Sequence, residues 1–122
     1  MRVAAYWVLA LALVACGGDD DDSGGGAPPA GTPVESITIT ARSIEFDIDE
    51  FIVEAGAEIT VTFENEDEGV PHNIAFSELG VRTDVEDGPT TQQLTFTADE
   101  PGEYEFVCDA HPPQMRGRVV VR

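Results

Sequence analysis

The chain has 122 residues, and its 24 acidic residues face six arginines and no lysine, so the formal net charge is −18. This length leaves room for one folded domain. The shortage of cations excludes nucleic acid as a partner, because nothing would neutralise the phosphates. The acidity either steers a basic partner toward the protein or reflects adaptation to a salty medium, and both interpretations stay open.

The first 15 residues have the pattern of an export signal. Arg2 precedes an apolar run of 13 residues that is shorter than a membrane span but suits the core of a secretory signal. The run ends in Leu-Val-Ala-Cys-Gly, which looks like a lipobox. We expect residues 1–15 to be removed, Cys16 to be lipidated, and the protein to be anchored on the extracytoplasmic face of a membrane, periplasmic or extracellular. The alternative is an ordinary signal peptide cut near Ala15, with Cys16 incidental.

Residues 16–33 have the composition of a disordered tether. After Cys16 the segment consists of Gly, Asp, Pro and other small residues, so it cannot offset the entropy lost on ordering. Its four consecutive aspartates have no scaffold to fix their oxygens and are interpreted as a solvated spacer rather than a calcium site. Residues 34–122 are then the folded domain.

From residue 34 onward the sequence reads as a series of short β-strands. Polar residues alternate with β-branched or aromatic ones, as in half-buried strands, over residues 36–40, 44–48, 58–63, 73–76, 93–97, 103–107 and 117–121. Residues 78–88 are the most irregular stretch and are expected to hold a helical turn or an excursion loop. Short strands separated by Gly, Pro and Asp predict an all-β antiparallel sandwich or barrel of about seven to eight strands.

Scarce metal-binding side chains gather in two places within this domain. His72 follows a proline, whereas Cys108, His111 and Met115 share one short segment, and the domain has no other His, Cys or Met. Two imidazoles, a thiolate and a weak thioether are the donor set of electron-transfer copper sites. Cys108 is interpreted as a thiolate protected by a metal, because a disulfide to Cys16 at the processing site would fasten no core.

These motifs resemble the cupredoxin family of small blue copper proteins, especially the group of plastocyanin, pseudoazurin, amicyanin and halocyanin. The resemblance covers most of residues 36–122 and is carried by residues 51–65, 71–74 and 101–117. It implies a Greek-key arrangement of the sandwich and one copper ion that alternates between Cu(I) and Cu(II).

The resemblance also implies a role for each residue of the site. His72 and His111 would be the nitrogen ligands, Cys108 the thiolate ligand and Met115 the axial ligand. Gln114 is the alternative axial donor, because the spacing after His111 varies in the family.

A second set of roles implied by the resemblance concerns the surroundings of the ligands. Asn73 would brace the ligand loops by hydrogen bonding. An apolar patch lined by Pro71, Pro112 and Pro113 would surround the edge of His111. The acidic run 64–68 is expected either to rim this docking face or to be a solvated loop.

The implied function is electron transport rather than enzymatic catalysis. The protein would be a monomer that carries one electron at a time and meets its redox protein donor and acceptor transiently. One alternative is a copper chaperone or storage protein that uses the same ligands, and another is a metal-free binding sandwich. Multicopper enzymes need more than the two histidines present, and a binuclear copper centre needs a second nearby cysteine.

Overall fold

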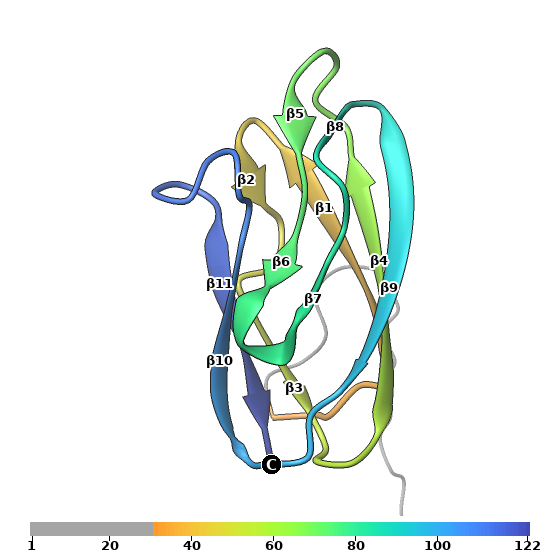
Figure 1. Cartoon of the computed structure of the whole chain (residues 1–122), viewed down its shortest axis with the longest axis vertical. Helices are drawn as coiled ribbons and strands as arrows, with labels where there is room; N and C mark the ends of the chain where they lie inside the picture. Colours follow the sequence, from red (N-terminus) through yellow and green to blue (C-terminus); the bar gives the residue numbers. More distant parts are fainter. Residues whose placement is uncertain (1–30) are drawn as a thin grey trace, which may run out of the picture.

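The computed structural model describes residues 31–122 and shows an elongated β-structure (Figure 1). Its strands and single 3₁₀ helix are β1 (Ser36–Arg42), β2 (Glu45–Phe46), β3 (Glu50–Val53), β4 (Glu58–Asn65), β5 (Pro71–His72), β6 (Ala75–Phe76), η1 (Ser77–Leu79), β7 (Val81–Arg82), β8 (Glu86–Asp87), β9 (Thr90–Thr97), β10 (Gly102–Val107) and β11 (Arg116–Val121). No helix in residues 31–122 has the length and apolar character needed to cross a membrane. The predicted signal peptide and lipidated Cys16 lie outside the described residues.

Two sheets enclose the core, as predicted. One sheet has the strand order β2-β1-β4-β9, the other has the order β3-β11-β10-β6-β7, and β5 pairs with β8 at the upper end of Figure 1. Most neighbouring strands run antiparallel, but β1 pairs with β4 and β3 pairs with β11 in parallel. The all-β sandwich is therefore confirmed, with two parallel pairs added to the antiparallel ones.

The alternation along β4 shows how the sequence builds this core. Ile59, Val61 and Phe63 are fully buried, whereas the residues between them are partly exposed. Because successive side chains of a strand point to opposite faces, this pattern directs one face of the sheet inward. On the opposite sheet, Phe106 of β10 packs in the same buried cluster as Cys108. The core therefore anchors the strand from which Cys108 emerges.

Two predicted strands are shorter than expected, for a local reason in each case. The strand predicted at 44–48 is reduced to β2, because Asp47 bonds back to Thr40 through both its backbone N–H and its side chain. The strand predicted at 73–76 is interrupted, because the backbone N–H of Ile74 donates to the Thr83 hydroxyl at 3.0 Å instead of to a strand. Side-chain acceptors replace the sheet hydrogen bonds at both places.

The structure also shows what the irregular stretch 78–88 contains and where the predicted tether meets the domain. The stretch holds the end of η1 followed by the short strands β7 and β8. Pro33, assigned to the tether, forms an isolated parallel bridge with Ile52, and the backbone N–H of Val34 donates to Ile52 O at 2.8 Å. Contact with the domain therefore begins before residue 34.

Gly117 in β11 has no room for a side chain. A Cβ at this position would lie 2.8 Å from the backbone oxygen of Asp49 and closer still to the ring of Phe106. Phe106 is fully buried, and Asp49 O accepts a hydrogen bond from Arg118 N–H. Neither neighbour can therefore move away from an added Cβ without loss of stability. We predict that Gly117→Ala lowers the free energy of unfolding by about 1–3 kcal/mol, measured by urea denaturation.

The neighbouring exposed residue provides the control for this substitution. Arg116 makes an exposed ion pair with Glu105, and such pairs contribute about 0–1 kcal/mol. Arg116→Ala should therefore change the unfolding free energy by less than Gly117→Ala does. Equal stability of the two variants would contradict the close packing inferred at Gly117.

Candidate metal centre

Three of the predicted ligands meet near one end of the sandwich. The Sγ of Cys108 lies 3.8 Å from Nδ1 of His72 and 3.8 Å from Nδ1 of His111. The ligand atoms of the three residues all lie within 4.8 Å of one another. His72 and Cys108 are fully buried, whereas His111 keeps part of its surface exposed. His72 lies 36 positions from Cys108 in the sequence and His111 lies three, yet the three side chains form one cluster of donors.

The spacing and chemistry of these donors fit a single metal ion. A sulfur about 2.3 Å and a nitrogen about 2.0 Å from one ion, at roughly 120°, stand about 3.7 Å apart. The observed sulfur–nitrogen separations are close to this value. One thiolate with two imidazoles in a plane is the donor set typical of electron-transfer copper.

Backbone hydrogen bonds close the segment 108–115 into a compact loop. Cys108 N–H donates to Met115 O at 3.0 Å, and Met115 N–H donates to His111 O at 2.9 Å. The Met115 side chain is fully buried in the same cluster as Cys108, whereas Gln114 is exposed. Of the two axial candidates, Met115 therefore lies on the inner side of the loop and Gln114 on the outer side.

Asp67 determines which nitrogen of His72 carries the proton. Its Oδ2 lies 2.7 Å from Nε2 of His72. Burial raises the pKa of Asp67, but hydrogen bonds from His72, Ser43 and Ile44 outweigh this effect and lower the pKa to about 2. The ionised carboxylate can only accept a hydrogen bond, so Nε2 of the neutral ring is the donor and Nδ1 keeps its lone pair toward Cys108.

The loop that carries Asp67 is itself fixed by buried Asn65 at the end of β4. The Asn65 amide donates to Val70 O at 2.9 Å and to Glu86 O at 3.0 Å, and its oxygen accepts Asp67 N–H at 2.8 Å. Sequence reasoning missed both residues, because it treated the run 64–68 as surface. The available signal was a carboxylate five residues before a histidine that needs an acceptor for its second nitrogen.

Asn73, which follows His72 in the chain, forms hydrogen bonds to Asp109, which follows Cys108, and to the backbone of Thr83. Its amide donates to Asp109 Oδ2 at 2.9 Å and to Thr83 O at 3.1 Å, and its oxygen accepts Asp109 N–H at 2.7 Å. The Asp109 carboxylate also accepts a hydrogen bond from Arg82 at 2.7 Å. Because Asn73 follows His72 in the chain and Asp109 follows Cys108, these bonds link the two loops directly.

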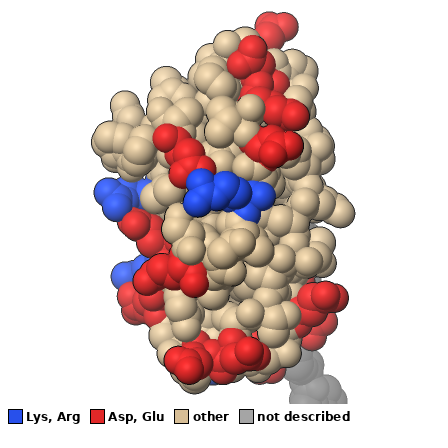
Figure 2. Space-filling view, viewed as in Figure 1, with Lys and Arg blue, Asp and Glu red and all other residues tan. Residues whose placement is uncertain are grey.

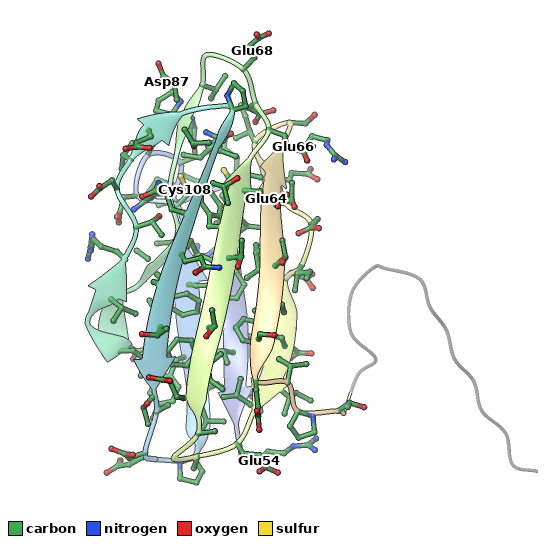
Figure 3. All side chains as sticks on the ribbon, turned by 90° about the vertical axis from the view of Figure 1, so that its right-hand side faces the viewer. Glu54, Glu64, Glu66, Glu68, Asp87 and Cys108 are labelled. Atoms are coloured by element: carbon green, nitrogen blue, oxygen red, sulfur yellow. The ribbon has the colours of Figure 1, made fainter. Side chains whose placement is uncertain are left out.

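The surface around the metal-binding end is acidic. Figure 2 shows acidic side chains at the upper and lower ends of one face, and the basic side chains lie near its middle and left edge beside further acidic ones. Figure 3 places Glu68 and Asp87 at the same end as Cys108, with Glu64 and Glu66 on the adjoining side. Within the run 64–68, however, Asn65 is buried and Asp67 faces His72, so only part of the run is surface.

Asp67→Asn tests the link between the carboxylate and His72. An amide cannot accept from the two backbone N–H groups and from Nε2–H with the same geometry, so the His72 ring loses its fixed orientation. We predict a loss of copper affinity of about 10- to 100-fold, measured by competition with a chelator. The exposed neighbour Glu68 is the control, and Glu68→Gln should leave the affinity unchanged. Equal affinities of the two variants would contradict this role of Asp67.

Comparison with known proteins gives consistent matches along the chain. The sequence model of a family described as a cupredoxin-like domain matches residues 4–121. Amicyanin-alpha of Methylorubrum extorquens is 36% identical over 93 residues, which cover 73% of this chain and 74% of that protein. Auracyanin-A of Chloroflexus aurantiacus is 29% identical over 154 aligned positions, which cover 99% of this chain and 95% of that protein.

Solved structures extend the match to three dimensions. The crystal structure of dithionite-reduced auracyanin from Roseiflexus castenholzii superposes with a TM-score of 0.67 at 26% identity. The match covers 75% of this chain and 99% of that one. The sandwich, the cluster of two histidines and one cysteine, and the match over nearly the whole sequence lead to one conclusion: the chain belongs to the cupredoxin family.

Proposed function

We propose that the protein is a blue copper electron carrier with one copper ion bound by His72, Cys108 and His111. The observation that carries this proposal is the 3.8 Å separation of the cysteine sulfur from both imidazole nitrogens. Met115 is proposed as the axial ligand because its side chain is buried in the cluster that contains Cys108. Bound copper would supply a one-electron couple between Cu(I) and Cu(II).

The protein contributes a rigid and shielded set of donors. His72 is oriented by Asp67, and the loops around His72 and Cys108 are joined through Asn73. Donors held in place by hydrogen bonds reorganise little when the charge of the site changes. Of the three donors, only His111 has exposed surface, so its ring edge is the proposed point where electrons enter and leave.

Exposed prolines next to the two histidines in the sequence support transient contact with redox protein partners. Pro71, Pro112 and Pro113 are exposed and provide apolar surface. A small interface of this kind suits an encounter that must dissociate after each electron. Two of the three donors are enclosed in the core, which agrees with a carrier rather than an enzyme. Among the relatives, auracyanin has been solved in a reduced form and amicyanin in a Cu(I) form.

Copper loading of the full chain tests the proposed function. We expect one copper ion per chain, an intense visible thiolate-to-copper absorption, a reversible midpoint potential and fast electron self-exchange. Tight Cu(I) binding without a reversible potential would instead identify a copper chaperone or storage protein. A protein that binds no copper after faithful loading would be a metal-free sandwich, and a colourless copper-loaded protein would also contradict the electron-carrier function.

We further propose that the carrier is a monomer attached to the extracytoplasmic face of a membrane through lipidated Cys16. The sequence around Cys16 supports this, and the predicted tether, apart from Pro33, which contacts the domain, would let the domain reach a donor and an acceptor. Mass spectrometry of the protein extracted from membranes should find residues 1–15 removed and a diacylglyceryl group on Cys16. An unmodified Cys16 in the mature protein would overturn the anchor and leave the copper site unaffected.

A further inference from the structure

The turn between β1 and β2 has a backbone conformation that its residues do not favour. Ser43 and Ile44 have φ values of +56° and +60°, and they form a two-residue hairpin loop closed by the pairing of Arg42 with Glu45. Such loops favour Asn-Gly or Gly-containing pairs, because a Cβ is disfavoured at positive φ. A β-branched residue there is an outlier. Something outside the turn must therefore stabilise it.

The Asp67 carboxylate supplies that stabilisation. Ser43 N–H donates to its Oδ1 at 2.7 Å, and Ile44 N–H donates to its Oδ2 at 3.0 Å. The Ile44 side chain is partly buried against the core, which holds the turn from the other side. Two successive N–H groups that point at one anion form a concave binding site for it. The carboxylate is thereby held at both oxygens.

Strand register explains why these distant residues meet. Strands β1 and β4 run parallel, and Ala41 lies opposite Asn65, so the segments that leave both strands emerge side by side. Glu66 N–H donates to Ala41 O at 2.9 Å, and Arg42 forms an ion pair with Glu66. The turn and the segment that carries Asp67 are thus joined by several independent contacts.

We infer that the Ser43–Ile44 turn is a positioning element for the metal ligand His72. Its two N–H groups fix the plane of the Asp67 carboxylate, which leaves Oδ2 directed at Nε2 of His72 at 2.7 Å. A turn 28 positions from the ligand in the sequence (72 minus 44) therefore orients the imidazole ring. The inference deepens the proposed function, since it takes His72 to be a ligand.

Insertion of one glycine between Ser43 and Ile44 tests this relay. The extra residue displaces the two N–H groups but leaves Asp67 and His72 in the sequence. The control is the same insertion between Gly56 and Ala57, in the β3–β4 turn at the end of the molecule opposite Cys108, where Glu54 is labelled in Figure 3. The readout is the Nε2–H signal of His72 in the metal-free full chain labelled with ¹⁵N-histidine, and its rate of exchange with water.

With the turn intact, the Nε2–H proton is expected to exchange slowly. The insertion at 43–44 should accelerate this exchange at least about tenfold and lower copper affinity about 10- to 100-fold, as expected for loss of an outer hydrogen bond to a ligand. The control insertion should change neither quantity. A folded 43–44 insertion variant with an unchanged His72 signal would overturn the inference. An intact signal in a wild-type chain that binds no copper would instead overturn the proposed function alone.

A second set of variants decides the question if the insertion prevents folding. The double substitution Ser43→Asn with Ile44→Gly keeps both N–H groups and suits the turn conformation, so the His72 signal should persist. Asp67→Asn is then introduced with the original turn and with the substituted one. The drop in the urea unfolding midpoint should be larger with the original turn, because only that turn needs the carboxylate. Equal drops would overturn the inference.

Discussion

Replacing Cys108 by serine should abolish the visible absorption of the copper-loaded protein. The band arises from charge transfer between a thiolate and Cu(II), and a serine hydroxyl at neutral pH is neither ionised nor soft enough to replace the sulfur. The Cys108 sulfur lies 3.8 Å from both imidazole nitrogens. Its loss therefore also leaves the proposed copper ion with only the two histidines from this cluster of three donors. We expect complete loss of the band and weaker copper binding, measured by absorption spectroscopy and chelator competition.

The second cysteine of the chain provides a matched control. Cys16→Ser removes the only other cysteine of the chain but leaves the three clustered donors unchanged, so the copper-loaded variant should keep its colour and its midpoint potential. A Cys108→Ser variant that retained the visible band would contradict the proposed ligand set. A colourless Cys16→Ser variant with bound copper would contradict it as well.

Phe106→Ala should cause the largest loss of stability among the substitutions considered. The Phe106 ring has no exposed surface and packs against Phe46, Phe51 and Phe76 with centroid distances of 5.4, 5.9 and 5.3 Å. Its removal leaves a cavity between the sheets, so we expect a loss of about 3–5 kcal/mol in the free energy of unfolding. A typical domain has only about 5–15 kcal/mol in total. Urea denaturation of the metal-free protein measures the change.

An exposed hydrophobic residue is the control for this truncation. Val85 is 48% exposed, and Val85→Ala should change the unfolding free energy by about 0.5 kcal/mol or less. Because Phe106 precedes Cys108 by two positions in β10 and the loop after it, the variant should also broaden the spectroscopic signals of bound copper. A Phe106→Ala variant as stable as Val85→Ala would show that the aromatic cluster does not hold the two sheets together.

Much of the fold was predictable because its causes are local. The alternation in residues 58–63 places Ile59, Val61 and Phe63 on one face, and the structure buries all three. Where side chains compete with the sheet for backbone hydrogen bonds, the same pattern predicted strands that are too long, as at residues 44–48. The acceptor that interrupts that strand is the Asp47 carboxylate, which accepts a hydrogen bond from the backbone N–H of Thr40, seven positions away. A pattern of polarity contains no information about that contact.

The donors of the site were predictable for a different reason. His72, Cys108 and His111 are scarce side chains whose chemistry limits their uses, and the structure brings them together. Asp67 was not recognised, because a carboxylate among other acidic residues has no distinguishing composition. Only its position opposite Nε2 of His72 separates it from its exposed neighbours.

The amino-acid sequence alone determined the all-β class and the set of candidate metal donors, because alternation and residue chemistry are properties of each segment by itself. The tertiary structure alone decided that the turn at Ser43 and Ile44 meets Asp67, and that Asp67 meets His72. These contacts follow from the parallel register of β1 with β4. A period of two residues specifies which face of a strand is buried but leaves its partner strand unspecified, so the shell around the ligands emerges only when the strands pair.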